Sequence, residues 1–224
     1  MKTKTLIRTL ALMTVSAGAG LLLAGCGTTS NYKQADKTGE GIATFREEIL
    51  NGKKAIDQTM KSLGAIEASA ATDPRKAYEQ YSKDVANLDS TANRIRKRGQ
   101  DMKEQGQAYF AQWESQLAQV KNPEIQKLAT ERKAKLKETF ENIKNLTEPL
   151  KAQFEPWMSD LKDLQTYLGN DLTVTGVDSA KSLFAKTHAS GTEVQKSMDA
   201  LVAELNTISA TITAAKAQQA SAKQ

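Results

Sequence analysis

The sequence predicts an all-α protein, an elongated antiparallel bundle of about four long helices with coiled-coil-like seams. The chain is rich in Ala, Lys, Gln, Glu and Leu and holds only four prolines and few aromatic residues, which favours helices over sheets. Across four long stretches, apolar residues recur at alternating spacings of three and four, as in helices that pack along a narrow seam. The connections between these stretches are short, so neighbouring helices are expected to run antiparallel.

The first part of the chain is typical of a secretory signal. Residues 1–8 carry basic residues and no acid, and residues 10–23 are uncharged and mostly apolar. This apolar run is shorter than the stretch of about 20 residues that a membrane-spanning helix needs. The motif Leu23-Ala24-Gly25-Cys26 resembles the lipobox of bacterial lipoproteins. The resemblance implies cleavage between Gly25 and Cys26 and attachment of a lipid to the Cys26 thiol.

Lipidation would anchor the protein stably, because two or three acyl chains hold a protein on a membrane where one chain binds only reversibly. By the same resemblance, Gly27 in place of Asp implies the outer membrane, facing the periplasm, if the host is Gram-negative. The alternative is an ordinary cleaved signal with Cys26 as an unimportant or core thiol. The expected organisation is a cleaved signal, a lipidated cysteine with a polar tether, a helical bundle and a flexible tail, at residues 1–25, 26–33, 34–217 and 218–224.

The first helix is predicted over about residues 35–70 and the second over about residues 74–120. Pro74 suits the first turn of the second helix, with Thr72 or Asp73 before it as the cap. The seam of the second helix contains Gly99 and Gly106, one heptad apart, although each glycine costs about 1 kcal/mol relative to alanine in a helix. We expect these glycines to allow a close helix approach or to make room for a large side chain. A cavity that faces a ligand is the alternative.

The third helix is predicted to begin at Asn122-Pro123 and to end near Leu168. Its second half contains Pro149 and Pro156, both off the seam. A proline inside a helix removes a backbone hydrogen bond and bends the axis. We therefore expect a bent but continuous helix, with a break near Thr147 as the alternative.

Residues 169–177 are predicted to be irregular; their β-branched residues could make a short extended segment, but the chain offers no comparable segment for it to pair with. Asp178 or Ser179 is then expected to cap a fourth helix that ends near residue 217. Gly191 lies on the seam of this helix. With the two seam glycines of the second helix, it completes the candidate cavity.

The sequence carries no motif for catalysis. It contains no phosphate-binding glycine loop, HExxH motif or nucleophile elbow. His188 is the single histidine, and a lone histidine near a helix seam is typical of a surface or packing residue. The single cysteine excludes a disulfide framework and a cysteine-based metal site. We therefore expect no enzymatic activity, no metal and no cofactor.

Charge gives little indication of a nucleic-acid partner. The net charge of +5 includes three basic residues of the predicted signal, so the remainder carries +2, which is close to balance. The densest basic cluster is Arg94, Arg96, Lys97 and Arg98. Such a cluster could meet anionic lipid headgroups or an acidic partner. We favour a solvated helix face that nearby acids, Asp101 among them, offset.

A second resemblance concerns the mature chain. Glu148-Pro149-Leu150, the run from Leu161 to Leu168 and the polar linker into an Ala- and Leu-rich final helix resemble an uncharacterised family of bacterial helical lipoproteins. This resemblance implies a helical shape and an envelope location, and it carries over no catalytic or binding residue. The sequence thus predicts a membrane-anchored periplasmic scaffold or adaptor whose partner is an envelope protein or a second copy. The alternative is a small-molecule or lipid binder with a cavity in the bundle.

Overall fold

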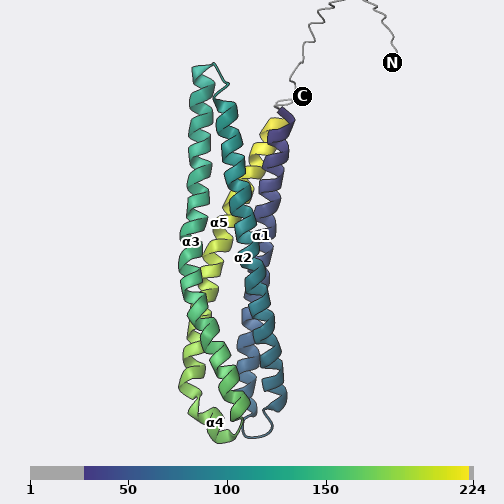
Figure 1. Cartoon of the computed structure of the whole chain (residues 1–224), viewed down its shortest axis with the longest axis vertical. Helices are drawn as coiled ribbons and strands as arrows, with labels where there is room; N and C mark the ends of the chain where they lie inside the picture. The colour runs from purple at the N-terminus through teal and green to yellow at the C-terminus, as the bar shows by residue number, and fades with distance from the viewer. Residues whose placement is uncertain (1–27, 222–224) are drawn as a thin grey trace, which may run out of the picture.

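The computed structural model describes the backbone of residues 28–221 and the side chains of residues 36–210. Within this range the chain forms helices and no strand, which confirms the all-α prediction. The helices are α1 (Thr28–Ser69), α2 (Arg75–Leu117), α3 (Pro123–Asn170), α4 (Val174–Ser179) and α5 (Lys181–Ser221). The four long helices lie lengthwise along one another, and the short α4 closes one end of the molecule (Figure 1).

Both ends of the helical region extend further than the sequence predicted. α1 begins at Thr28, so residues 28–33, which we expected to form a polar tether, are helical. α5 continues to Ser221 and takes in most of the predicted flexible tail. Once a helix has formed, each added residue gains one backbone hydrogen bond at little further cost, which explains both extensions. The predicted signal and Cys26 lie outside the described residues.

The start of α3 follows the predicted combination of a cap and a proline, whereas at α2 the N-cap position is Pro74 itself, with no side-chain cap hydrogen bond. The side chain of Asn122 accepts hydrogen bonds from Glu124 N at 2.9 Å and Ile125 N at 3.3 Å. At α2, Asp73 Oδ1 accepts from Arg75 N at 3.2 Å. The Arg75 side chain bonds the same carboxyl and holds the pKa of Asp73 below its usual value. These contacts satisfy amide groups that a helix start leaves without an intrahelical partner.

The predicted irregular stretch, residues 169–177, is mostly helical instead. α3 continues to Asn170, and only a short link separates it from α4. The last long helix begins at Lys181, after α4, so Asp178 and Ser179 lie inside α4 and do not cap α5.

Local hydrogen bonds explain why α4 forms where the β-branched residues suggested extended chain. The Thr173 hydroxyl accepts a hydrogen bond from Gly176 N at 3.1 Å and caps α4. The same hydroxyl donates to Asp171 Oδ1 at 2.6 Å, which also accepts from Thr173 N at 3.2 Å. This network fixes a helix start and outweighs the weak β preference of the flanking residues.

The predicted seams form one continuous apolar core. The α1 seam residues that are at most 1% exposed are Ile42, Phe45, Ile49, Ile56, Leu63 and Ile66. Leu161, Leu164 and Leu168 of α3 and Leu201 and Leu205 of α5 are all fully buried. The spacing of three and four therefore identifies the buried face of each long helix.

α3 is continuous through both of its prolines, as predicted. Pro149 and Pro156 lie inside the helix, and its axis changes direction along its length (Figure 1). Each proline leaves the carbonyl group four residues earlier without its helical donor. These carbonyl groups belong to Asn145 and Ala152, which are exposed and open to water.

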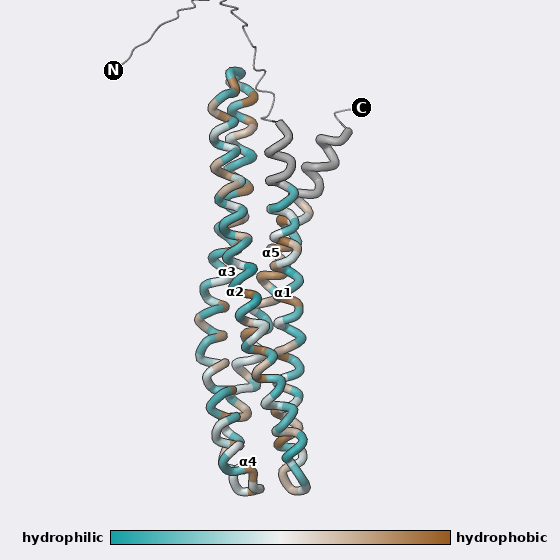
Figure 2. The backbone as a smooth tube through the Cα atoms, turned by 45° about the vertical axis from the view of Figure 1, so that its right-hand side comes forward, coloured by the Kyte–Doolittle hydropathy of each residue, from teal (hydrophilic) through white to brown (hydrophobic). Residues whose placement is uncertain are grey.

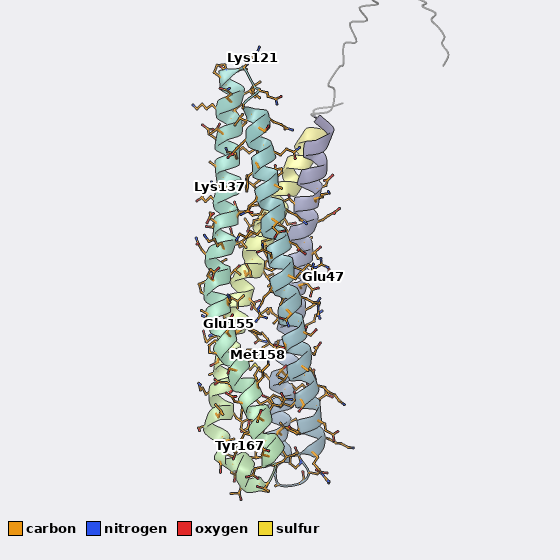
Figure 3. The ribbon with its side chains drawn as sticks, in the orientation of Figure 1. Glu47, Lys121, Lys137, Glu155, Met158 and Tyr167 are labelled. Carbon is orange, nitrogen blue, oxygen red and sulfur yellow. The ribbon has the colours of Figure 1, made fainter. Side chains whose placement is uncertain are left out.

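The four long helices do not all pack together along their whole length. The α2–α3 hairpin separates from α1 and α5 toward the end that contains Lys121, and hydrophobic residues continue along it (Figures 2 and 3). In this arm, defined as residues 107–142, no residue is buried. The apolar residues of the arm are covered only in part.

A pair of identical substitutions on α3 tests this difference in packing. Leu161 is fully buried and Leu128 is 66% exposed. Leu161→Ala should lower the free energy of unfolding by about 2–5 kcal/mol, because it leaves a cavity in the core. Leu128→Ala should change it by no more than about 0.5 kcal/mol. Chemical denaturation followed by circular dichroism measures both, and equal losses would contradict the burial described above.

Candidate functional site

A groove with a volume of about 850 Å³ lies between α2 and α3. Its floor consists of core side chains of α1 and α5, among them Phe45, Ile49 and Leu201. Its rims are exposed residues of α2 and α3, and α5 passes behind the space between these two helices (Figure 1). The volume lies within the range of about 300–1,000 Å³ that is typical of ligand sites. We call this feature the α2–α3 groove.

Two side-chain contacts join α2 and α3 at different heights. Toward α4, the Tyr81 hydroxyl donates a hydrogen bond to Leu161 O at 2.7 Å, and its burial raises the pKa of Tyr81. Toward the arm, the rings of Phe110 and Phe140 meet edge to face with their centroids 5.4 Å apart. Phe110 and Phe140 themselves line the groove, whereas the Tyr81–Leu161 contact lies beyond its lining residues.

Two of the three glycines of the candidate cavity line this groove. A Cβ atom built at Gly106 would lie 2.6 Å from Phe140 Cε1, and one at Gly99 would lie 3.2 Å from Phe45 Cε2. Both glycines thus make room for an aromatic ring, in agreement with the expectation that they accommodate a large side chain. They also line the groove, so the idea of a ligand-facing gap stays open for both.

Gly191 belongs to a different part of the core. A Cβ atom there would lie 2.6 Å from Met60 Sδ and 3.0 Å from Trp157 Cζ2. The indole of Trp157 is 1% exposed, and its Nε1 donates to Thr187 O at 2.8 Å. Gly191 accommodates this ring and does not line the groove, so the three glycines do not share one cavity.

The rims of the groove carry more basic than acidic residues. The charged residues that line it are Arg96, Lys103, Lys137, Lys144 and Lys151, with Glu114, Glu141 and Glu148. Lys144 Nζ lies 3.7 Å from Glu141 Oε2. Glu114 pairs with Lys133 at 3.0 Å, and this hydrogen bond and charge lower the pKa of Glu114. Among the described side chains, Arg96 and Lys103 on the α2 rim and Lys137 on the α3 rim make no ion pair, although the charge of Lys137 also lowers the pKa of Glu114.

The predicted basic cluster does not form one patch. It consists of Arg94, Arg96, Lys97 and Arg98. Arg94 pairs with Glu48 of α1 at 3.3 Å, whereas Lys97 and Arg98 pair with Asp101 at 3.5 and 3.7 Å. Arg96 instead lines the groove. The paired residues Arg94, Lys97 and Arg98 fit the favoured interpretation of a balanced, solvated face. Only Arg96 belongs to the candidate site.

The remaining sequence candidates add no chemistry to the site. His188 is half-buried on α5, with its ring beside Gly64 of α1. Residues 36–210 contain no group of three His, Cys, Asp or Glu side chains that could hold a metal ion. None of the described helices has the length and hydropathy that crossing a bilayer requires. Gly25 and Cys26 lie outside the described residues, so cleavage and lipidation stay predictions.

Sequence reasoning missed the α3 side of the groove. In the sequence, Phe140 follows the spacing of three and four of the third helix, and no pattern distinguishes Lys137 from the other lysines of the chain. The one signal was the pair of seam glycines on α2, which implied bulky partners on an unidentified helix. Identifying Phe140 as the partner of Gly106 required the tertiary structure, because periodicity does not reveal the register between two helices.

Comparison with known proteins identifies a family. The model of a family described as "Protein of unknown function (DUF2959)" matches residues 35–215, which is most of the chain. The chain therefore belongs to this family, and the match confirms the predicted resemblance to an uncharacterised domain. No curated protein and no solved structure matches the chain.

Two glycine substitutions test the close approach at the arm end of the groove. Gly106→Ala should lower the free energy of unfolding by about 1–3 kcal/mol, because the new methyl group displaces the Phe140 ring. Gly64→Ala is the matched control, since a Cβ there would meet its nearest neighbour at 3.9 Å, an ordinary contact distance. It should raise stability by about 0.5–1 kcal/mol through helix propensity alone. If both substitutions raise stability in thermal or chemical denaturation, the Phe140 ring can move aside without a measurable cost.

Proposed function

We propose that this DUF2959 protein is a lipid-anchored, non-catalytic interaction module of the cell envelope. In this proposal it presents the α2–α3 groove to a helix of an envelope protein. The observation that carries the proposal is a groove of about 850 Å³ between α2 and α3 that is lined by core side chains of α1 and α5. An amphipathic helix laid in an apolar groove is a recurrent mode of recognition, and its apolar face would complete the packing that α2 and α3 leave open.

The dimensions and charge of the groove suit a helical partner. The rims run from Arg96 to Glu114 on α2 and from Lys137 to Phe154 on α3. At 1.5 Å per residue each rim is about 25 Å long, enough for four to five helical turns. The excess of basic residues along both rims favours a partner with acidic residues beside its apolar face.

The lipobox supplies the cellular location in this proposal. A lipid on Cys26 would tether the bundle to a membrane, which in a Gram-negative host would be the outer membrane on its periplasmic side. We propose no enzymatic activity, cofactor or metal, because the polar groups of the groove spread along two rims and do not converge on one point.

Charge reversal on the rim tests whether a protein partner binds in the groove. Lys137→Glu should reduce recovery of the partner several-fold in crosslinking from living cells, with a photoreactive residue placed at Gln107 on the opposite rim. Lys135→Glu, an exposed position of α3 outside the groove, is the matched control and should leave recovery unchanged. Both variants should keep the stability of the parent within about 0.5 kcal/mol.

Three outcomes separate the alternatives. Loss of one envelope protein with Lys137→Glu alone supports the proposal. If crosslinks form only between copies of this chain, the partner is a second copy and not an envelope protein. Equal losses with both variants would contradict a specific groove contact.

The groove also favours a second candidate function, the binding of a single-chain anionic amphiphile. Its floor is apolar, its volume of about 850 Å³ is that of a ligand site, and Lys103 and Lys137 place one lysine without an ion pair on each rim. An acyl chain could lie along the floor with its anionic head between these two lysines. This candidate differs from the first in needing a ligand that copurifies with the isolated protein.

A large side chain placed on the rim tests whether the groove binds an amphiphile. Ala111 is exposed and lines the groove, whereas Ala108 is exposed and lies outside it. Ala111→Trp should reduce the amount of bound fatty acid at least about tenfold, in native mass spectrometry or after solvent extraction, because the indole occupies the binding space. Ala108→Trp should retain the ligand. Protein isolated without any amphiphile, and unable to take up a fatty acid, would remove this candidate.

A further inference from the structure

The start of α1 and the closed end of the α2–α3 hairpin lie at the same end of the molecule (Figure 1). α1 begins at Thr28, two residues after Cys26 in the sequence. Two residues span at most about 7 Å. A membrane that holds Cys26 therefore lies close to the start of α1, and the hairpin end points toward the same membrane.

This hairpin end, which we call the tip and define as residues 118–128, exposes large apolar side chains. Ile125 is 51% exposed and Leu128 is 66% exposed. They are three residues apart on α3, so they lie on neighbouring positions of one helix face. The two other large hydrophobic residues that are exposed in the described structure, Tyr167 and Val174, lie at or near α4, at the opposite end (Figures 1 and 3).

Basic residues accompany these apolar side chains. Lys121 lies at the turn of the hairpin (Figure 3), and Lys127 lies on α3 between the two apolar residues. Both lysines are exposed, and among the described side chains neither makes an ion pair. Exposed apolar residues beside lysines are typical of segments that rest in the headgroup region of a membrane.

The tip is a fixed structure and not a loose loop. Asn122 caps α3, and the side chain of Gln126 donates a hydrogen bond to Val120 O across the turn. Further along the arm, Lys133 pairs with Glu114 at 3.0 Å and joins α3 to α2. These contacts hold the chain reversal in place while Ile125 and Leu128 stay uncovered.

We propose that the tip inserts into the headgroup region of the same bilayer that holds Cys26. Ile125 and Leu128 enter the interface, and Lys121 and Lys127 contact anionic headgroups. This inference rests on the proposed lipid anchor. Leu128 lies five residues after the α3 start at Pro123, or about 8 Å along the helix. That distance is comparable to the interfacial zone of one leaflet, about 5–8 Å deep.

Two points of attachment would set the orientation of the bundle. A lipid on one residue leaves the attached domain free to tilt, whereas a second contact through the tip restricts it. The long axis would then stand away from the membrane, with α4 at the far end and the α2–α3 groove open to the side (Figure 1). The groove would remain accessible to a partner in the periplasm.

Site-specific fluorescence tests the contact. Cys26 is the one cysteine of the chain, and a lipid would occupy its thiol, so Leu128→Cys adds one reactive thiol to the lipidated protein. An environment-sensitive fluorophore at this thiol should shift to shorter wavelength in vesicles of phosphatidylethanolamine and phosphatidylglycerol. Nitroxide-labelled lipids in the same vesicles should quench it. Val174→Cys, at a position 49% exposed near the other end, is the matched control and should report water.

A partition measurement separates failure of this inference from failure of the proposed anchor. The mature chain with Cys26→Ser should bind the same vesicles weakly, and Ile125→Ser with Leu128→Ser should lower its partition coefficient at least about tenfold. If the lipidated protein floats with vesicles while the label at position 128 reports water, the anchor stands and the tip contact is overturned. If the Cys26→Ser chain floats as well as the lipidated protein, and the double substitution releases it, the tip contact stands and the anchor is overturned.

Discussion

The structure depends on one constraint, the burial of a narrow apolar seam along each long helix. α1 meets this constraint most completely, because its seam residues from Ile42 to Ile66 are almost fully buried. Burying one such side chain contributes roughly 1.5–3 kcal/mol, so α1 supplies a large share of the core energy. Both α2 and α5 pack against it. Where α2 and α3 leave α1 and α5, no described residue of the arm is buried.

The groove arises because the distance between α2 and α3 varies along the bundle. Gly106 lets the Phe140 ring approach α2 at the arm, and the Tyr81 hydroxyl reaches the α3 backbone toward α4. Between these contacts, α3 passes through Pro149 and Pro156, which bend its axis. Pro149 lies within the stretch of α3 that lines the groove, and Pro156 lies just beyond it.

The proposed anchor, tip and groove have distinct physical bases. The anchor depends on a short motif outside the described residues. The tip depends on the placement of two exposed apolar side chains beside lysines at the end where α1 starts. The groove depends on divergence of α2 and α3 and on the excess of basic residues along its rims. Together they describe a bundle held upright on a membrane with a binding surface on its side.

The sequence by itself determined the features that arise within one helix. The spacing of apolar residues identified the buried faces, the cap and proline at Asn122-Pro123 placed the start of α3, and the position of Pro149 and Pro156 off the seam predicted a bent, continuous helix. Each of these depends on residues a few positions apart, so the local pattern contains the information.

Only the tertiary structure decided which helix faces meet and at what height. It placed Gly191 against Trp157 and away from the groove, opposed Gly106 to Phe140, and brought the hairpin tip to the end where α1 begins. It also replaced the expected irregular stretch by α4. The register between helices is fixed by contacts between residues far apart in the chain, and the repeating seam of one helix is compatible with several such registers. Long-range packing selects one of them, and the groove and the position of the tip both result from that selection.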